Sequence, residues 1–521
     1  MIPKNPLKPG VIPYQDDDFR IENNSARPRL PHFISTSDNF YKPVDIPINK
    51  RNFIYCPCAP NPLFPQLGYC TTEYPFESSG FNLMDRSAGI SIKDKLNKTV
   101  SVGPTMGWRT SRSDVCIKEG AAYWEVEVVK GGTTVPVPSD NNILKKDTID
   151  CSPHLRFGVS RREASLEGPV GFDVYGYGIR DQGLESFHEG KLRKVLNSDQ
   201  YQLKQGDVLS FILYLPQLNV QVNQAKEYTI QRINALKNAS KSMKTHRTST
   251  TEQWNSHNNS EEPATKKRQK INKNTDFHLA LLEDIKYNDI IRDHIAIRYK
   301  NQLFFEATDY IKTTKPEYYS SDKRERLDYY RLDESFLAVY CNGKYLGKAF
   351  QDLDPFLPPF SELQYNEKFY SGYWRNGEYI EEYNNNSNQT DSEDMYQRSS
   401  KNKNSNLHGH KKGLLLRNKY VNNNRLGYYP TVSCFNGGEA NIITEREKLK
   451  YFDVITPPEP LDIKDIKTLN TLFMEQVADD IVWDIIDEVE EEINSKKTFS
   501  IYDFKQNGSV KNENDSDLHN V

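Results

Sequence analysis

Apolar and polar residues alternate with a period of two through the middle of the chain. Residues 121–129 read AAYWEVEVV, and every second position from Trp124 onwards is apolar. The same alternation runs over residues 154–160 (HLRFGVS), and residues 206–215 (GDVLSFILYL) open with a Gly-Asp turn before an apolar run. A period of two puts alternate side chains on opposite faces of a strand. The pattern predicts β-strands, with a half-buried strand at 121–129 whose Trp124 lies in the core.

A hairpin signal lies within residues 335–350, SFLAVYCNGKYLGKAF. Two apolar runs flank Asn342-Gly343, and both residues accept the positive φ angles of a tight hairpin turn. Residues 428–435 (YYPTVSCF) predict a further strand. With about eight to eleven such strands and few helices, the chain is predicted to be mainly β, an antiparallel β-sandwich.

Polar stretches interrupt this pattern. Residues 224–275 and 366–425 lack a hydrophobic period and are poor in apolar residues. Such segments cannot bury enough apolar surface to fold, so we expect two disordered low-complexity insertions within one domain over 101–460. Residues 1–100 are rich in Pro and Asn, which predicts an extended arm lying on that domain. Residues 495–521 are predicted to form a disordered tail.

The period changes near the C-terminus, where apolar residues recur at i, i+4 spacing. The two neighbouring rows include Phe473, Val477, Ile481, Ile485, Val489 and Ile493, with Val482 and Ile486. They predict an amphipathic helix over 468–494 with one apolar stripe. The other face carries nine acidic residues with no Lys or Arg between them, so these acids are expected to repel one another. The stripe must be buried either on the chain's own sandwich or on a partner, and periodicity leaves both open.

Composition narrows the class of protein. The 521 residues include 68 Lys and Arg against 72 Asp and Glu, a formal net charge of −4. This balance excludes a histone-like cationic protein, so an electrostatic partner must meet a local patch. The chain has no run of about 18 apolar residues, and no transmembrane helix is expected. Seven Cys are too sparse for a disulfide scaffold and indicate a reducing compartment.

Candidate chemistry is sparse. Cys56 and Cys58 form a C-x-C pair, followed by Cys70. A zinc site needs four ligands, so we favour ordinary thiols near an aromatic cluster. No G-x-S-x-G, P-loop or H-E-x-x-H motif is present. His154 with Asp173 nearby suggests an acid–base pair, but no nucleophile or orienting partner is placed beside them, so no catalytic residue or metal is assigned.

Several motifs, taken together, resemble the SPRY domain. They are the strand ending YWEVEV, the R-x-G-V-S strand, the Q-G-D-V-L turn and the C-N-G-x-x-L-G hairpin. Within that superfamily Gly107-Trp108-Arg109-Thr110, residues 169–173 (PVGFD) and Phe304-Phe305-Glu306 resemble the Ash-two-like (Bre-two) family of COMPASS histone methyltransferase subunits. The resemblance covers about 100–215, 291–311, 335–360 and 427–455. It implies an SPRY-type sandwich acting as a non-catalytic scaffold.

The resemblance also implies two protein partners. An acidic segment of a WD-repeat subunit (RbBP-five, Swd-one type) would bind at Arg156, Pro169, Phe172 and Arg180, where Phe172 replaces the usual Tyr. Surface salt bridges are the alternative for the two arginines. The C-terminal helix would dock on a DPY-thirty (Sdc-one) type helical dimer. Trp108 is expected to be a packing residue.

The family's role implies a nuclear protein that activates a SET-domain methyltransferase, with S-adenosylmethionine bound by that other subunit and no cofactor in this chain. The family's animal members carry an N-terminal zinc-finger and winged-helix module, for which residues 1–100 have no ligands. Contact with the nucleosome would instead fall to Lys266, Lys267, Arg268 and Lys270, for which an import signal or a solvated loop is the alternative. A second function class, an SPRY adaptor of a ubiquitin ligase, lacks a visible cullin box or RING cysteines.

Overall fold

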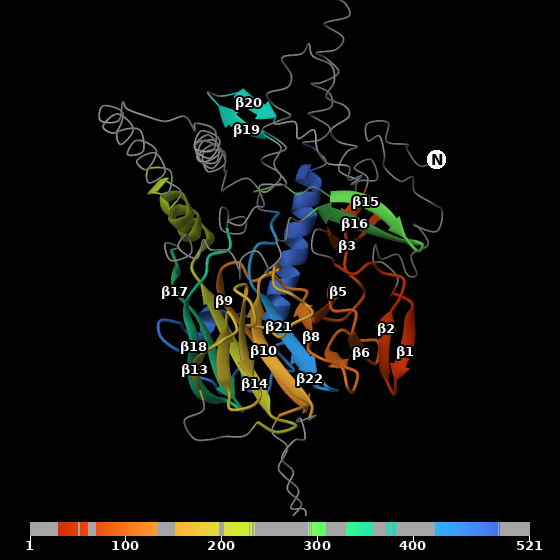
Figure 1. Ribbon diagram of the computed structural model, residues 1–521, viewed down its shortest axis with the longest axis vertical. Helices are drawn as coiled ribbons and strands as arrows, with labels where there is room; N and C mark the ends of the chain where they lie inside the picture. Colours follow the sequence, from red (N-terminus) through yellow and green to blue (C-terminus); the bar gives the residue numbers. More distant parts are fainter. Residues whose placement is uncertain are drawn as a thin grey trace, which may run out of the picture.

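The computed structural model describes residues 30–49, 53–60, 69–132, 152–196, 203–228, 294–308, 330–357 and 423–487, two short strands between 372 and 381, and single residues beside these ranges, among them Arg292. Within these ranges, two large β-sheets enclose a common core, and a helix near the C-terminus runs up from the sandwich (Figure 1). The predicted mainly β, antiparallel sandwich with a C-terminal helix is confirmed.

The first sheet has ten strands. Nine lie in the spatial order β1 (Phe33–Ser37), β2 (Phe40–Pro43), β6 (Ile90–Lys93), β7 (Thr99–Val102), β22 (Glu439–Ile443), β9 (Gly120–Lys130), β14 (Val208–Leu215), β17 (Leu332–Cys341) and β18 (Lys344–Leu353). The tenth, β23 (Ile466–Thr468), pairs in parallel with β9, whereas all other pairs are antiparallel.

The second sheet has seven strands. Their spatial order is β13 (Lys191–Val195), β12 (Glu185–His188), β11 (Gly176–Arg180), β10 (His154–Ser160), β21 (Tyr429–Phe435), β8 (Arg109–Ser113) and β5 (Phe81–Arg86). Between the sheets, Trp124 is buried and stacks on Phe211 with ring centroids 5.3 Å apart. This confirms the predicted core position of Trp124.

From Ala121 to Val126, strand β9 is buried on both faces, which corrects the expectation of a half-buried strand. Residues 444–466 cover its second face. There Glu125 accepts hydrogen bonds from the Tyr123 hydroxyl (2.7 Å) and from the N–H groups of Lys450 and Tyr451 (both 2.8 Å). A buried carboxylate needs such donors. The alternation gave the correct facing, but it could not show that a distant segment covers the polar side.

The predicted hairpin at Asn342-Gly343 is confirmed. It joins β17 to β18, with φ of 48° at Asn342 and 79° at Gly343. The Asn342 side chain also accepts the N–H of Val208 (2.9 Å), which ties the turn to the neighbouring strand.

Several predicted boundaries differ from the structure. The arm predicted over 1–100 contributes β1, β2, β5, β6 and the start of β7 to the two sheets of the sandwich, so these residues are part of the domain rather than an arm lying on it. The range 224–275 begins inside a helix at 218–228, and the range 366–425 contains the hairpin of β19 (Gly372–Arg375) and β20 (Glu378–Glu381). Residues 230, 231, 234 and 423–425 of these two ranges are also described, whereas their remaining parts and residues 495–521 lie outside the described residues.

A separate four-stranded sheet lies beside the sandwich. Its order is β15 (His294–Tyr299), β16 (Gln302–Thr308), β3 (Phe53–Pro60) and β4 (Tyr69–Thr71). Phe304-Phe305, expected within the SPRY domain, therefore lies in this sheet and pairs with β3.

The C-terminal helix occupies residues 469–487, within the predicted range 468–494. Thr468 caps its start, because the N–H of Thr471 donates to Thr468 Oγ1 (3.3 Å). Leu469, Leu472 and Phe473 anchor its first turn on the main core. Among the described residues, no helix has the length and apolar character needed to cross a membrane.

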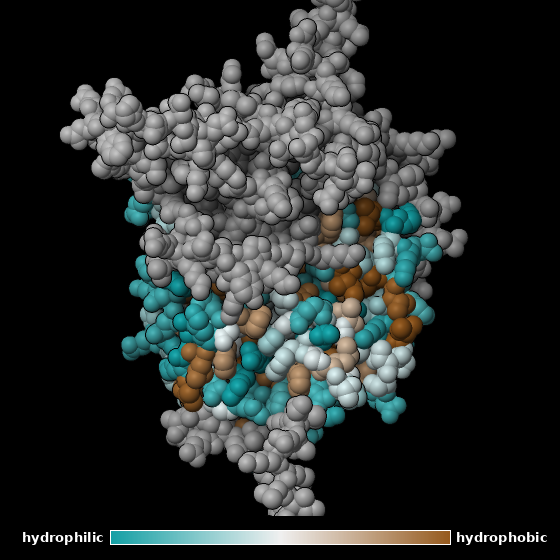
Figure 2. Space-filling view, viewed as in Figure 1, coloured by the Kyte–Doolittle hydropathy of each residue, from teal (hydrophilic) through white to brown (hydrophobic). Residues whose placement is uncertain are grey.

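The described surface seen in Figure 2 mixes hydrophilic and hydrophobic residues, and the hydrophobic ones form small groups. On this side, recognition would therefore depend on particular side chains rather than on one broad apolar face.

Candidate functional site

Two arginines face each other on the outer side of the seven-stranded sheet. Arg156 in β10 pairs in register with Arg180 in β11. Their neighbours Leu155 and Ile179 are fully buried, so alternation directs both arginines away from the core. The two guanidiniums lie over the ring of Phe187 in β12, at 4.8 and 5.5 Å from its centroid. The outward direction of Arg156 predicted from the sequence is confirmed.

The two arginines differ in the acceptors that their guanidiniums have. Arg180 Nε lies 2.7 Å from Glu185 Oε2. Arg156 Nε is buried and has no hydrogen-bond partner among the described residues. Burial and the charge of Arg180 lower the pKa of Arg156 to about 10, so it stays protonated at neutral pH. Because like charges on paired strands repel, an anionic ligand would relieve the repulsion and supply the missing acceptor.

The turn that carries Pro169 and Phe172 lies directly on β11. The N–H of Phe172 donates to the Pro169 carbonyl (3.1 Å) and closes the turn. A Cβ on Gly178 would stand 2.1 Å from the carbonyl oxygen of Val170, so glycine is required for this close approach. Phe172 remains 51% exposed and available to a ligand.

Phe187 connects the turn to the arginine pair. A Cβ on Gly171 would lie 2.4 Å from the Phe187 carbonyl oxygen, and both guanidiniums cover the Phe187 ring. The turn that bears Pro169 and Phe172 therefore lies beside the backbone of Phe187, whose ring contacts Arg156 and Arg180. We call these five residues, together with Trp108, the arginine surface.

Trp108 has two contacts rather than the single packing role predicted. It is half-buried and packs on Phe435 with ring centroids 5.3 Å apart. The Arg156 guanidinium also lies 5.4 Å from the centre of its ring. Sequence reasoning missed Phe187 and undervalued Trp108, because only the strand register shows that their rings meet the arginines.

Buried polar contacts fix the loop that bears the turn. Arg112 donates to Asp85 at 2.8 and 3.1 Å and to carbonyl groups of residues 161–164. Asp173 accepts the N–H groups of Ser165 and Tyr175, each at 3.0 Å. The arginine surface is therefore held by rigid neighbours, as specific recognition requires.

The candidate acid–base pair is not assembled as considered from the sequence. His154 Nδ1 lies 3.4 Å from Asp181 Oδ2, not beside Asp173. The Asp173 carboxylate instead accepts backbone N–H groups of the loop that bears the turn. Asp181 itself accepts the N–H groups of Gly132 and Leu155, both at 2.9 Å. These contacts give the pair a structural role.

The three clustered cysteines lie in the small sheet. Cys58 is buried with Tyr69 and Phe305, and Cys56 packs against this group. Burial raises the pKa of Cys56 and of Cys70 to about 12, which keeps both thiols protonated at neutral pH. No group of three or more potential metal ligands occurs among the described residues.

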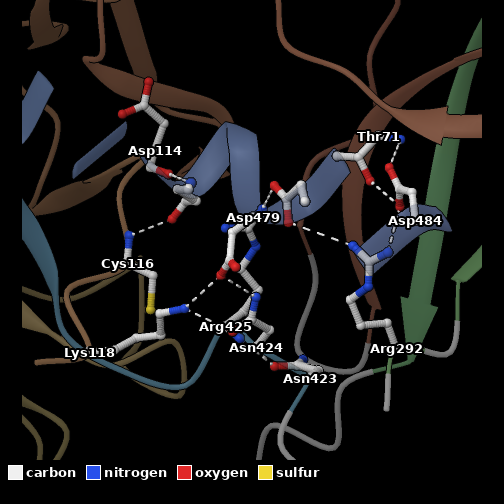
Figure 3. Close-up of polar contacts among 12 residues, drawn as sticks. Thr71, Asp114, Cys116, Lys118, Arg292, Asn423, Asn424, Arg425, Asp479 and Asp484 are labelled. Carbon is white, nitrogen blue, oxygen red and sulfur yellow. Dashed lines mark hydrogen bonds and ion pairs between the residues drawn. The ribbon is translucent and has the colours of Figure 1, made fainter. Parts of the chain in front are cut away.

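The acidic side of the C-terminal helix meets the body of the protein, and we call this contact the helix seam. Figure 3 shows Asp479 and Asp484 of the helix facing Lys118, Arg292 and Arg425 of the body. Asp479 Oδ2 accepts from Lys118 Nζ (3.4 Å), and Asp484 accepts from Arg292 (2.6 Å).

Two further contacts extend the helix seam. Arg425 forms an ion pair with Asp480. Gln476 accepts the N–H of Cys116 (3.0 Å) and donates to the Asp114 carbonyl (2.8 Å). The expected repulsion among the helix acids is therefore corrected at these positions, because basic groups distant in sequence neutralise them.

Part of the apolar stripe points away from the body. Ile481, Val482 and Val489 are 45%, 54% and 42% exposed, and Val477, Ile485 and Ile486 are half-buried. Phe473 differs from the prediction, because it packs against the main core. Ile493 and the basic residues Lys266, Lys267, Arg268 and Lys270 lie outside the described residues.

Two antiparallel sheets that enclose a common core, with charged and aromatic side chains on the outer side of one of them, define a β-sandwich with a candidate peptide-binding surface. The chain belongs to the family of COMPASS components that includes BRE2 of Saccharomyces cerevisiae, with which it is 52% identical over 93% of this chain and 99% of that protein. The Set1 complex component ash2 of Schizosaccharomyces pombe is 26% identical, and the alignment spans 94% of this chain but 53% of that protein.

A more distant relative is the Set1/Ash2 histone methyltransferase complex subunit ash-2 of Caenorhabditis elegans, 25% identical over 33% of this chain and 28% of that protein. No family model matches the chain. Among solved structures, the TRIM65 PSpry domain covers 27% of this chain and 68% of that domain, with 14% identity and a TM-score of 0.18. That score is low, and the fold description depends on the strand order given above.

Proposed function

We propose that this protein is a non-catalytic scaffold subunit of a COMPASS-type histone methyltransferase complex. Its family membership supports this function. The protein would act in the nucleus by stabilising the active arrangement of a SET-domain methyltransferase, and that other subunit would bind S-adenosylmethionine. Residues Lys266 to Lys270 are a candidate contact to the nucleosome.

The arginine surface binds an acidic segment of the WD-repeat subunit. The single observation that carries this proposal is the unpaired, buried Nε of Arg156 beside a second guanidinium. Carboxylates of an extended peptide would accept from both arginine forks, and Phe172 and Trp108 would pack against the peptide's apolar parts.

The C-terminal helix binds a small helical dimer through its apolar stripe. The helix meets the body through its acidic side, so Ile481 and Val482 remain exposed for a partner. Full burial of each such side chain would contribute about 1.5–3 kcal/mol before the entropy of association is subtracted.

The arginine surface is tested by changing both Arg156 and Arg180 to Glu and measuring the affinity of the acidic WD-repeat peptide by calorimetry. We expect binding to be lost, because the peptide would face two added negative charges. The matched control changes Arg446 and Lys464 to Glu, since both are exposed residues of the segment that covers the other sheet. Undiminished affinity in the Arg156 and Arg180 variant would move the site elsewhere.

The helix is tested by changing Ile481 and Val482 to Ser in the full chain. We expect capture of the helical dimer to be lost while the WD-repeat peptide still binds. The control is Val454→Ser, which changes a residue that is 70% exposed but outside the helix.

The activating role is tested by reconstituting the complex with and without this chain, and equal methylation of histone three would contradict it.

A further inference from the structure

The C-terminal helix lies on the protein by its charged side. Asp480 and Asp484 are 4% and 5% exposed, although both are acidic. Acidic residues are rarely buried unless they are paired with a basic group. The partners of Asp480 and Asp484 therefore determine how the helix packs against the body.

Arg292 contacts three of these acids at once. Its Nη2 lies 2.6 Å from Asp484 Oδ1, its Nε 2.8 Å from Asp487 Oδ2 and its Nη1 3.6 Å from Asp480 Oδ1. The Arg292 side chain is only 2% exposed. Because the guanidinium is a rigid planar fork and the acids are spaced at i, i+4 and i+7, a rotation of the helix or a shift along its axis would break these contacts.

A second set of contacts brackets Arg292. Arg425 pairs with Asp480, and Lys118 pairs with Asp479. From the small sheet, Thr71 donates to Asp484 through its N–H (2.6 Å) and its hydroxyl (3.1 Å). The helix is thereby held against both the sandwich and the small sheet, which Figure 3 shows on either side of it.

The contacts of the helix with the main hydrophobic core lie at its base. The helix residues that join or pack against the main core are Leu469, Leu472 and Phe473, all in its first turns. From Gln476 onwards, the hydrogen bonds and ion pairs of the helix seam tie the helix to the body, and the apolar residues Ile481 and Val482 are exposed.

We infer that Arg292 and Arg425 are positioning residues that fix the direction in which the helix presents its apolar stripe. This inference rests on the proposed function, in which that stripe takes a small helical dimer. Through the two arginines, a dimer bound to the helix would have a set orientation relative to the sandwich and hence to the methyltransferase.

The first experiment measures hydrogen exchange of the backbone amides of residues 476–487 in the full chain. We expect Arg292→Met and Arg425→Met to exchange about tenfold faster or more than the unchanged protein, because the seam no longer holds the helix. The control, Val454→Ser, which changes an exposed residue outside the helix, should exchange at the unchanged rate. Unchanged exchange in both arginine variants would overturn the inference. So would a result in which Leu472→Ala accelerates exchange and neither arginine variant does.

The second experiment uses a DPY-thirty-type dimer and the reconstituted complex. We expect the arginine variants to capture the dimer as the unchanged chain does, but to support less histone methylation, because the dimer is no longer held in one orientation. Full methylation by loosened variants would contradict a positioning role. Failure of the unchanged chain to bind the dimer would defeat the proposed function, whereas the exchange result would still decide whether the seam holds the helix.

If Arg292→Met does not fold, a variant that changes the acidic partners of Arg292 on the helix tests the same contacts. Asp484→Asn with Asp487→Asn removes two of the three acids at Arg292 and leaves the arginine in place. It should accelerate exchange over the same amides, and its failure to do so would count against the inference.

Discussion

Gly178 shows how one residue without a side chain sets the position of a binding surface. Its backbone lies so close to Val170 that the turn bearing Pro169 and Phe172 rests on β11. The run of glycines and aromatics at 175–178 is therefore a packing requirement that serves recognition.

Gly178→Ala is expected to destabilise the protein by about 3 kcal/mol and to weaken binding of the acidic peptide, because its Cβ would overlap the Val170 carbonyl. Urea unfolding and calorimetry measure the two effects. Gly103→Ala is the control, since its nearest neighbour, Met106 Sδ, lies at an ordinary 3.4 Å. Equal stability of the two variants would show that the turn shifts without cost.

Sequence reasoning at this scale succeeded where alternation alone decides. It gave the outward direction of Arg156 and the inward direction of Trp124. It could not find Phe187, because the aromatic ring meets the arginines only through the register of three strands. It also could not see that Arg292 meets acids almost two hundred positions away (|i−j| = 192 for Asp484).

At the scale of elements, the C-terminal helix joins a partly buried acidic region of the sandwich. Asp114 follows β8, and its carboxylate accepts the N–H of Gly80 (3.0 Å). Its backbone carbonyl accepts a hydrogen bond from the Gln476 side chain of the helix. Burial raises the pKa of the Asp114 carboxyl to about 7, even though Gly80 and Lys98 oppose the shift. The junction therefore holds a proton that the unfolded chain would release near its ordinary pKa.

This proton makes stability depend on pH. The pKa is about 4 in the unfolded chain and about 7 in the folded protein, so the stabilisation is complete below about pH 4 and declines as the pH rises through 7. Between pH 5 and 7, Asp114 alone should lower the free energy of unfolding by up to about 1.4 kcal/mol per pH unit.

Asp114→Asn is expected to make this decline shallower, because the amide keeps an acceptor for Gly80 and does not titrate. Urea unfolding at pH 5, 6 and 7 measures the slope. Asp453→Asn serves as the control, since Asp453 is exposed and pairs only with Arg446 among its described ion-pair contacts. Identical slopes in the Asp114 variant and the unchanged protein would contradict the raised pKa.

The existence and start of this helix were predictable from its period, and so was its stripe. The side on which it docks was not, because an acidic face without internal bases is ordinarily exposed to solvent. The neutralising residues come from segments that precede β15 and β21, and the sequence gives no local sign that these segments meet the helix.

At the scale of the whole molecule, the helix is part of the body as well as a candidate partner site. A chain ending at Thr468 keeps β23 but leaves Arg292 and Arg425 without their carboxylates and removes the buried Leu469. We expect it to be less stable than the full chain by about 3–5 kcal/mol, the usual cost of stranding a buried charge.

Urea unfolding of the two chains measures this difference, and a chain ending at 494, which keeps every described helix residue, is the control. Equal stability of the chain ending at Thr468 would show that the seam contributes nothing to folding. Truncation is therefore expected to destabilise the body as well as to remove the candidate partner site. The changes at the exposed residues Ile481 and Val482 test partner binding without removing the contacts of the helix with the body.

The fold class was predictable because strand periods and turn signals are local. The strand order was not, since neighbours in each sheet come from opposite ends of the sequence. β22 lies between β7 and β9, and β21 lies between β10 and β8. The predicted boundary at residue 100 failed for this reason, as it cut through β7.

The late arrival of these two interior strands has a consequence for biosynthesis. Until residues 429–443 have left the ribosome, each sheet of the nascent protein has a gap at its centre with unpaired strands on either side. Folding must then wait until most of the chain has been translated, and such non-local topologies form slowly. Chaperone protection of the unfinished sheets should therefore matter more for this protein than for one whose neighbouring strands are consecutive.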